Sequence, residues 1–109
     1  MTDQQRIAMY RKKKAFVDNI SKALELSDTT VNKVSYEVWT RYNERFNMNV
    51  YYEFIVVEFI GGAESHRNVS GTSHSGIFQE IGKLINGGYY EEKGYYESFA
   101  EEGFTKVEL

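Results

Sequence analysis

The stretch MNVYYEFIVVEFI, residues 48–60, constrains the fold more than any other part of the chain. It is dense in Val, Ile, Tyr and Phe, which favour extended backbone. Apolar residues occupy both sets of alternate positions, and Glu53 and Glu58 are the only charged residues. A strand that is apolar on both faces is typical of the interior of a sheet. We therefore predict a central strand over residues 48–60.

The segments on either side of this strand predict its neighbours. Residues 34–42 alternate Val, Tyr, Val, Thr and Tyr with Ser, Glu, Trp and Arg, which favours a strand paired with residues 49–60. Gly61-Gly62 is a two-residue hairpin signal, and the more polar residues 63–71 would return from it as an edge strand. The open alternative is a helix over residues 31–46, with an apolar face made of Val31, Val34, Val38, Tyr42 and Phe46.

A first helix is predicted from a cap at Thr2 and Asp3 to about Leu26. Lys13 falls in the middle of its apolar face, so the first half of the helix is expected to overhang the body or to lie along something charged. The other interpretation is that Lys13 extends out of a partly covered face. That face consists of Met9, Phe16, Val17, Ile20, Ala23 and Leu24.

A second helix is predicted after a cap at Thr72, Ser73 or Ser75, and it ends at Asn86-Gly87-Gly88. Its apolar stripe consists of Ile77, Phe78, Ile81, Leu84 and Ile85. A short helix at 95–102 and a final short strand at 104–109 complete the order. We therefore predict one α+β domain over residues 1–109, with both helices on one face of a mostly antiparallel sheet of three to four strands.

Composition excludes several kinds of site and of location. The chain has no Cys, so it can form no disulfide and no thiolate metal site. Its start lacks the apolar core of a signal peptide, and the apolar run at 50–60 is too short to span a bilayer. We therefore expect a cytoplasmic protein without a membrane partner, and nothing in the sequence predicts a cofactor or a metal.

Charge is distributed unevenly along the chain, although its net value is only −3. Residues 1–14 hold five basic residues and one acidic residue, a net of +4. Residues 86–109 hold two lysines and six glutamates, a net of −4. Such asymmetry bears on partners and on association rates more than on the fold.

The segment GGYYEEKGYYESFAEEGF, residues 87–104, contains the unit Gly-Tyr-Tyr-Glu twice. Neighbouring tyrosines point apart in either regular geometry, so about two of the four rings should be exposed. Tyr gives a large contact area beside water, and the carboxylates would complement a basic surface. The alternative is that the rings only cover the end of the sheet. The predicted protein-binding residues are Tyr89, Tyr90, Glu91, Glu92, Tyr95, Tyr96, Glu97, Glu101 and Glu102.

These features predict a small non-enzymatic protein that binds a basic, nucleic-acid-handling protein partner and inhibits or adapts it. Small size, acidity and the absence of Pro and Cys are similar in composition to phage and mobile-element products such as anti-CRISPR inhibitors of host defence. That likeness is compositional, and no motif accompanies it.

Residues 20–34, ISKALELSDTTVNKV, carry a different hypothesis, since they resemble the bacterial helix-turn-helix motif. Apolar residues stand where the motif needs them, although Glu25 occupies the turn position that Gly usually holds. The resemblance implies a DNA-binding regulator that contacts nucleic acid directly. Its contact residues would be Arg11, Lys12, Lys14, Thr29, Thr30, Asn32 and Lys33.

His66 and His74 lie near several serines, which raises the question of nucleophilic catalysis. Such chemistry needs an oriented base, a third orienting group and an oxyanion site, and the sequence marks out no such set. The two histidines are therefore interpreted as polar loop residues, and no catalytic residue is predicted.

Overall fold

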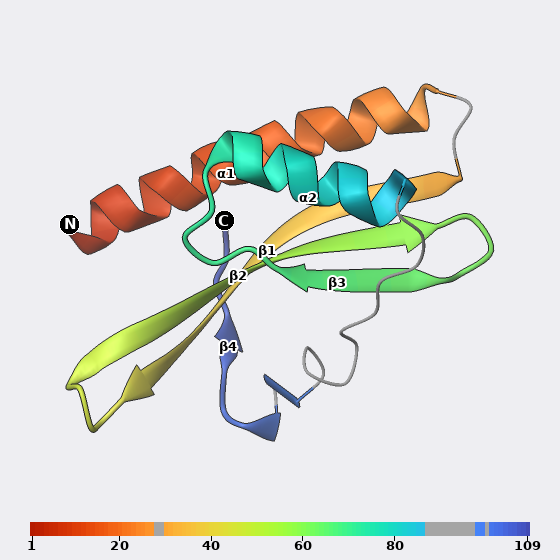
Figure 1. Ribbon diagram of the computed structural model, residues 1–109. Helices are drawn as coiled ribbons and strands as arrows, with labels where there is room; N and C mark the ends of the chain where they lie inside the picture. The colour runs from red at the N-terminus through yellow and green to blue at the C-terminus, as the bar shows by residue number, and fades with distance from the viewer. Residues whose placement is uncertain (28–29, 87–97, 100) are drawn as a thin grey trace.

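The computed structural model describes residues 1–27, 30–86, 98–99 and 101–109 (Figure 1). The sheet has the strand order β3-β2-β1-β4 and every pair is antiparallel. Figure 1 shows both helices on one face of the sheet, which confirms the predicted α+β architecture. In chain order the elements are α1 (Asp3–Glu25), β1 (Val31–Asn43), β2 (Met48–Phe59), β3 (Glu64–Asn68), α2 (His74–Asn86) and β4 (Thr105–Lys106).

The β1–β2 hairpin is the longest pairing in the sheet. Val34 lies opposite Val57, and Tyr36 lies opposite Ile55, so alternate residues of the two strands share a face. The predicted strand is therefore confirmed, and the alternative helix over residues 31–46 is wrong. The segment forms a strand because it is rich in Val, Tyr, Thr and Trp. These residues pack well on a pleated surface that is covered on both sides.

The central position of β2 is also confirmed, since β1 and β3 pair with its two edges. Phe54 and Ile55 point to opposite faces and both are completely buried. Gly61 and Gly62 take the positive φ angles of 105° and 96° in the turn to β3, where a side chain would be strained. The edge position predicted for the polar return strand is confirmed as β3.

Helix α1 begins with a capping box. The Thr2 hydroxyl accepts a hydrogen bond from the Gln5 N–H at 3.1 Å, and the Gln5 side chain accepts one from the Thr2 N–H at 2.8 Å. The packing face differs from the prediction at its C-terminal end, because Ala23 is exposed and Ser21 is buried. The Ser21 hydroxyl accepts a hydrogen bond from the Val34 N–H at 2.9 Å, which fastens the helix to β1.

Helix α2 follows the predicted cap and most of the predicted stripe. Ser73 precedes the helix, and its hydroxyl accepts a hydrogen bond from the Gly76 N–H at 3.2 Å. Ile77, Ile81 and Leu84 are buried, but Phe78 is 59% exposed, so its assignment to the core is wrong. Phe78 lies about 100° around the helix from Ile77, outside the narrow face that meets the rest of the fold.

The sheet has an apolar cluster on each face. The cluster beneath the helices joins Val17 of α1 to Val38 and Ile55 of the sheet and to Ile77 of α2. The cluster on the opposite face consists of Phe54, Phe99 and Phe104, with Trp39 and Tyr52 packed against it. In the parts of the chain that the structure describes, no helix is long and apolar enough to cross a membrane.

Candidate functional site

A buried carboxylate, Glu53, lies where the elements of the fold meet. One oxygen of Glu53 accepts hydrogen bonds from Lys13 Nζ at 2.7 Å and from the Tyr36 hydroxyl at 2.6 Å. Its second oxygen accepts one from the Gly71 N–H at 2.7 Å. Lys13 is itself buried, so the interpretation that it extends into solvent is wrong. The first half of α1 does lie along a charged group, as the other interpretation expected. That group is Glu53, which is buried inside the fold.

These four residues, Lys13, Tyr36, Glu53 and Gly71, form what we call the Glu53 network. It joins α1, β1, β2 and the loop between β3 and α2. Burial, together with the hydrogen bond to Glu53, raises the pKa of Tyr36 far above its ordinary value, so the hydroxyl stays a neutral donor. The oxygens of Glu53 already bind three donors from within the chain, which suits a carboxylate that holds elements together.

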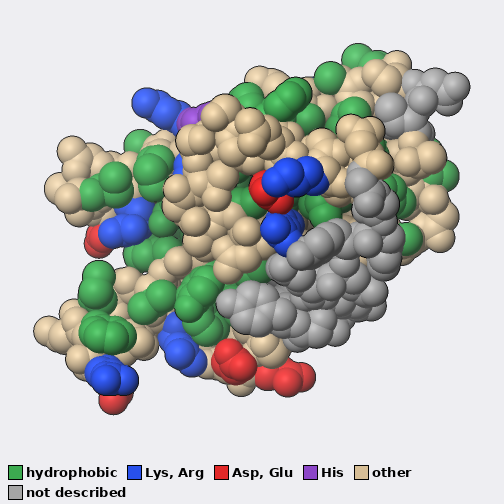
Figure 2. Space-filling model, viewed as in Figure 1, with side chains coloured by type: hydrophobic (Ala, Val, Ile, Leu, Met, Phe, Trp, Pro, Cys, Tyr) green, Lys and Arg blue, Asp and Glu red, His purple; other side chains and the backbone are tan. Residues whose placement is uncertain are grey.

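A groove of about 510 Å³ lies beside this network, between the first turns of α1 and the start of β2. All three methionines of the chain line it, and two tyrosines add apolar surface. Figure 2 shows the surface hollowed between the N-terminal end of the chain and the projecting end of the β1–β2 hairpin. This methionine groove is lined by Met1, Arg6, Met9, Tyr10, Met48, Asn49, Val50, Tyr51, Glu53, Ser70 and Gly71.

Arg6 provides the charge of the methionine groove. Its guanidinium carbon lies 4.5 Å from the centre of the Tyr51 ring, in cation–π contact. Its Nε atom is buried and has no hydrogen-bond partner among the described residues. Interaction with the Tyr10 side chain raises the pKa of Arg6, and burial raises the pKa of Tyr10. The groove therefore combines a charged guanidinium with a neutral phenol.

The far end of the β1–β2 hairpin, residues 41–50, projects beyond the rest of the sheet, and we call it the hairpin arm (Figure 1). Neither β3 nor β4 pairs with it, because β3 ends opposite Phe54 and β4 opposite Thr40. Tyr42, Phe46 and Met48 are 52%, 62% and 53% exposed. Hydrogen bonds from the Phe46 N–H to Asn43 Oδ1 at 3.3 Å, and from the Tyr42 hydroxyl to Asn47 Oδ1, shape the turn.

Arg41 connects the base of this arm to the acidic C-terminal part of the chain. It donates a hydrogen bond to the Glu102 carbonyl at 3.0 Å and lies over the Phe104 ring at 4.6 Å. The side chains of Glu101 and Glu102 are exposed beside it. The acidic C-terminal part of the chain is therefore fastened to the base of the arm through Arg41.

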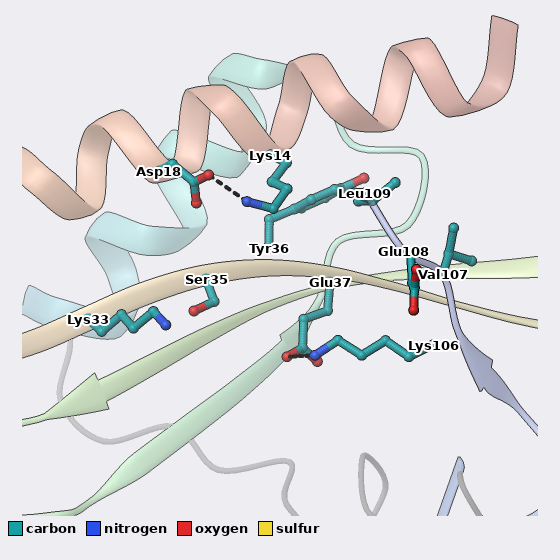
Figure 3. Close-up of a pocket in the computed structure, with 10 residues that line it drawn as sticks. All are labelled: Lys14, Asp18, Lys33, Ser35, Tyr36, Glu37, Lys106, Val107, Glu108 and Leu109. Atoms are coloured by element: carbon teal, nitrogen blue, oxygen red, sulfur yellow. Dashed lines mark hydrogen bonds and ion pairs between the residues drawn. The ribbon is translucent and has the colours of Figure 1, made fainter. Parts of the chain in front are cut away.

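A polar pocket of about 480 Å³ lies along β1 on the side that faces away from β2 (Figure 3). Lys14, Lys33 and Lys106 line it, together with Asp18, Glu37 and Glu108. Lys14 pairs with Asp18 at 2.7 Å, and Lys106 pairs with Glu37 at 2.9 Å. The three cationic and the three anionic side chains cancel one another. Their charges therefore give the pocket no preference for binding a cation or an anion.

Most of the predicted protein-binding residues lie outside the described residues. These are Tyr89, Tyr90, Glu91, Glu92, Tyr95, Tyr96 and Glu97. Glu101 and Glu102 are described, and both are exposed as the prediction requires.

The helix-turn-helix interpretation is wrong, because the second helix does not form. Val31 already begins β1, whose alternate residues are buried, and a strand cannot present the face of a recognition helix. Of its contact residues, Thr29 is not described and Lys14 is paired with Asp18. The others, Arg11, Lys12, Thr30, Asn32 and Lys33, are exposed but belong to three different segments.

The two histidines do not share a loop. His66 belongs to β3 and is buried, with its Nε2 atom 3.0 Å from Glu64 Oε1. His74 begins α2, is exposed, and meets the Phe16 ring edge to face at 5.1 Å. The interpretation of both as polar loop residues is therefore wrong for His66. Across the described ranges, no three His, Asp or Glu side chains are grouped to hold a metal ion.

Sequence reasoning missed the Glu53 network and the methionine groove. A signal for the network was present, because Lys13 and Glu53 each place a charge in the apolar face of a well-defined element. Opposite charges in two faces that must pack together predict a buried pair. Comparisons with models of protein families, with curated proteins and with solved structures found no match for the chain.

Proposed function

We propose that the chain is a small binding protein that acts without catalysis, by contacting a basic protein partner. One observation supports the proposal above all: the hairpin arm carries three exposed large apolar side chains, and the exposed Glu102 is bound at its base by Arg41. Tyr, Phe and Met are enriched at the centre of protein interfaces. An aromatic ring at the end of a projecting hairpin can enter a pocket of a partner and act as a hot spot.

The carboxylates define the chemistry of the proposed partner. Arg41 holds the Glu102 backbone against the base of the arm, so the exposed acidic residues lie at that base. Acidic groups at the rim of an interface steer a basic partner and fix its register. The two tyrosine pairs within residues 89–97 lie outside the described residues, and their role in binding the same partner stays a prediction.

More specifically, we propose that the partner is a nucleic-acid-handling protein. The chain would act as its inhibitor, of the phage or anti-CRISPR kind. Composition supports this form, through the small size and the acidic C-terminal segment. An inhibitor should reduce the activity of the captured partner in proportion to its occupancy, which a titration against that activity would measure.

Affinity capture with matched variants tests the proposal. The chain is immobilised and exposed to a cell extract, and the retained proteins are quantified by mass spectrometry. We expect a basic protein that wild type retains, that Phe46→Ser loses and that Phe78→Ser keeps. Phe78 is a suitable control because its 59% exposure almost equals the 62% of Phe46, while it lies on α2.

A reversal of charge then tests the role of the acidic residues. Changing Glu101 and Glu102 to Lys should slow association with the captured protein and weaken the salt dependence of its rate. If Phe46→Ser keeps every retained protein, or if the retained protein is acidic, the proposed surface is wrong.

A further inference from the structure

The methionine groove has the size and the lining of a site for an apolar side chain. Its volume of about 510 Å³ falls within the range of small-ligand sites. Met1, Met9 and Met48 line it, and unbranched methionine side chains can adapt to the shape of what they contact.

The charge of the groove follows from two side chains that act differently. Glu53 lines the floor, but Lys13 neutralises it at 2.7 Å, so this carboxylate attracts little from outside. Arg6 remains, with Tyr51 beneath its guanidinium; Asp3 acts on it electrostatically but does not line the groove, and among the described residues no carboxylate forms an ion pair with it. The groove is therefore positive on balance and attracts a carboxylate.

We propose that the methionine groove binds an acidic segment of a partner protein, in which an apolar side chain stands next to Asp or Glu. The apolar side chain enters among the methionines, and the adjacent carboxylate accepts hydrogen bonds from Arg6. Arg6 is the cation that lines the groove, and a guanidinium binds a carboxylate through charge-assisted hydrogen bonds.

The groove is formed before any ligand arrives, because the Glu53 network fixes its walls. Lys13 ties α1 to Glu53 on β2, and Gly71 ties the β3–α2 loop to the same carboxylate. A preformed site costs less ordering entropy on binding. The groove adjoins the proposed contact of the arm, since Met48, Asn49 and Val50 line it, whereas Tyr42, Phe46 and the two carboxylates Glu101 and Glu102 do not. It would make the chain an adaptor with two sites of opposite charge.

The test uses the methyl groups of the methionines, since all three line the groove. The chain is labelled with ¹³C at the methionine methyls and titrated in NMR with the blocked dipeptide acetyl-Leu-Glu-amide. We expect saturable shifts of the Met9 and Met48 methyls with a dissociation constant in the millimolar range. The neutral dipeptide acetyl-Leu-Gln-amide should bind roughly tenfold more weakly, as expected for loss of a charged hydrogen bond.

Variants of two arginines on the same helix locate the charge preference. Arg6→Gln should abolish the difference between the two dipeptides, and Arg6→Lys should keep part of it. Arg11→Gln should leave the difference unchanged, because Arg11 is exposed and is not among the groove residues. Equal binding of both dipeptides to wild type, or no saturable shift with either, would overturn the proposal even if Arg6→Gln failed to fold. Because Phe46, Glu101 and Glu102, which carry the proposed function, do not line the groove, failure of this test leaves the proposed function standing.

Discussion

The two ends of the β1–β2 hairpin differ in their surroundings although they belong to the same pair of strands. Toward β3 and the helices, Tyr36, Glu53 and Ile55 are buried, and the Glu53 network joins four segments of the chain. In the hairpin arm, strands pair only with each other and Tyr42 and Phe46 are exposed. The contacts that stabilise the fold are therefore concentrated at the buried end of the hairpin. The arm is not needed for the fold, so it can expose apolar side chains.

The largest expected effect comes from the buried end. Glu53→Ala should lower the free energy of unfolding by about 3–5 kcal/mol, because it leaves the Lys13 ammonium buried without its partner. Urea unfolding followed by circular dichroism measures the change. The matched control is Glu44→Ala in the exposed turn of the arm, which should stay within about 0.5 kcal/mol of wild type. Equal effects of the two variants would contradict the comparison.

Removing both charges together should cost much less than removing either one. Apolar replacement of a buried ion pair is often neutral or stabilising, whereas removal of one partner strands the other. We expect the double variant Lys13→Met with Glu53→Leu to be at least about 2 kcal/mol more stable than the sum of the single variants predicts. A double-mutant cycle in urea measures this coupling, and additive single effects would show that the pair does not act as a unit.

Tyr36→Phe should have an intermediate effect of about 1.5 kcal/mol, since Glu53 loses one of its three donors. The effect should also depend on pH. The folded-state pKa of Tyr36 is raised, so its contribution is complete below the unfolded-state pKa of about 10 and declines as the pH rises above it. Chemical unfolding between neutral and strongly alkaline pH should show a shallower decline for Tyr36→Phe than for wild type. Tyr42→Phe in the exposed arm is the control and should keep the wild-type decline.

The smallest expected effect on stability lies in the arm. Phe46→Ser should change the free energy of unfolding by no more than about 0.5 kcal/mol, because the ring is mostly exposed. Backbone amides of residues 41–43 and 48–50 should exchange with solvent faster than those of residues 34–38 and 53–57. Hydrogen exchange followed by NMR measures both sets, and equal protection would mean that the arm is as stable as the body.

Much of the fold could be predicted from residues that are neighbours in the sequence. The apolar run at 48–60 predicted a central strand, and the alternation at 34–42 predicted its partner, because side chains in a strand alternate between faces. The predicted packing faces of the helices were wrong at Phe78 and Ala23, which are exposed. Each helix packs on one side only, and these two residues lie outside that side. Periodicity locates an apolar stripe but does not say how much of it a neighbouring element will cover.

The candidate sites were harder to predict because their residues are distant in the chain. The groove brings together residues of the first helix, the start of β2, and Ser70 and Gly71 of the loop before α2. The exposure of Tyr42 and Met48, which lie within the predicted strands, was not predicted, since alternation alone does not reveal that β3 and β4 stop short of residues 41–50. Where the neighbouring strands end is a property of the whole sheet.

By itself the sequence determined the α+β class, the central position of β2, the cap at Thr2 and the separation of charge between the two ends of the chain. Each of these depends on side-chain type and local spacing, which act over one or two turns of a helix or along one strand. The tertiary structure alone decided that Lys13 meets Glu53 across forty positions, and that a groove lined by all three methionines remains beside them. The physical reason is that burial and pairing of charge depend on which faces meet, and the meeting of faces is settled only when the whole chain packs.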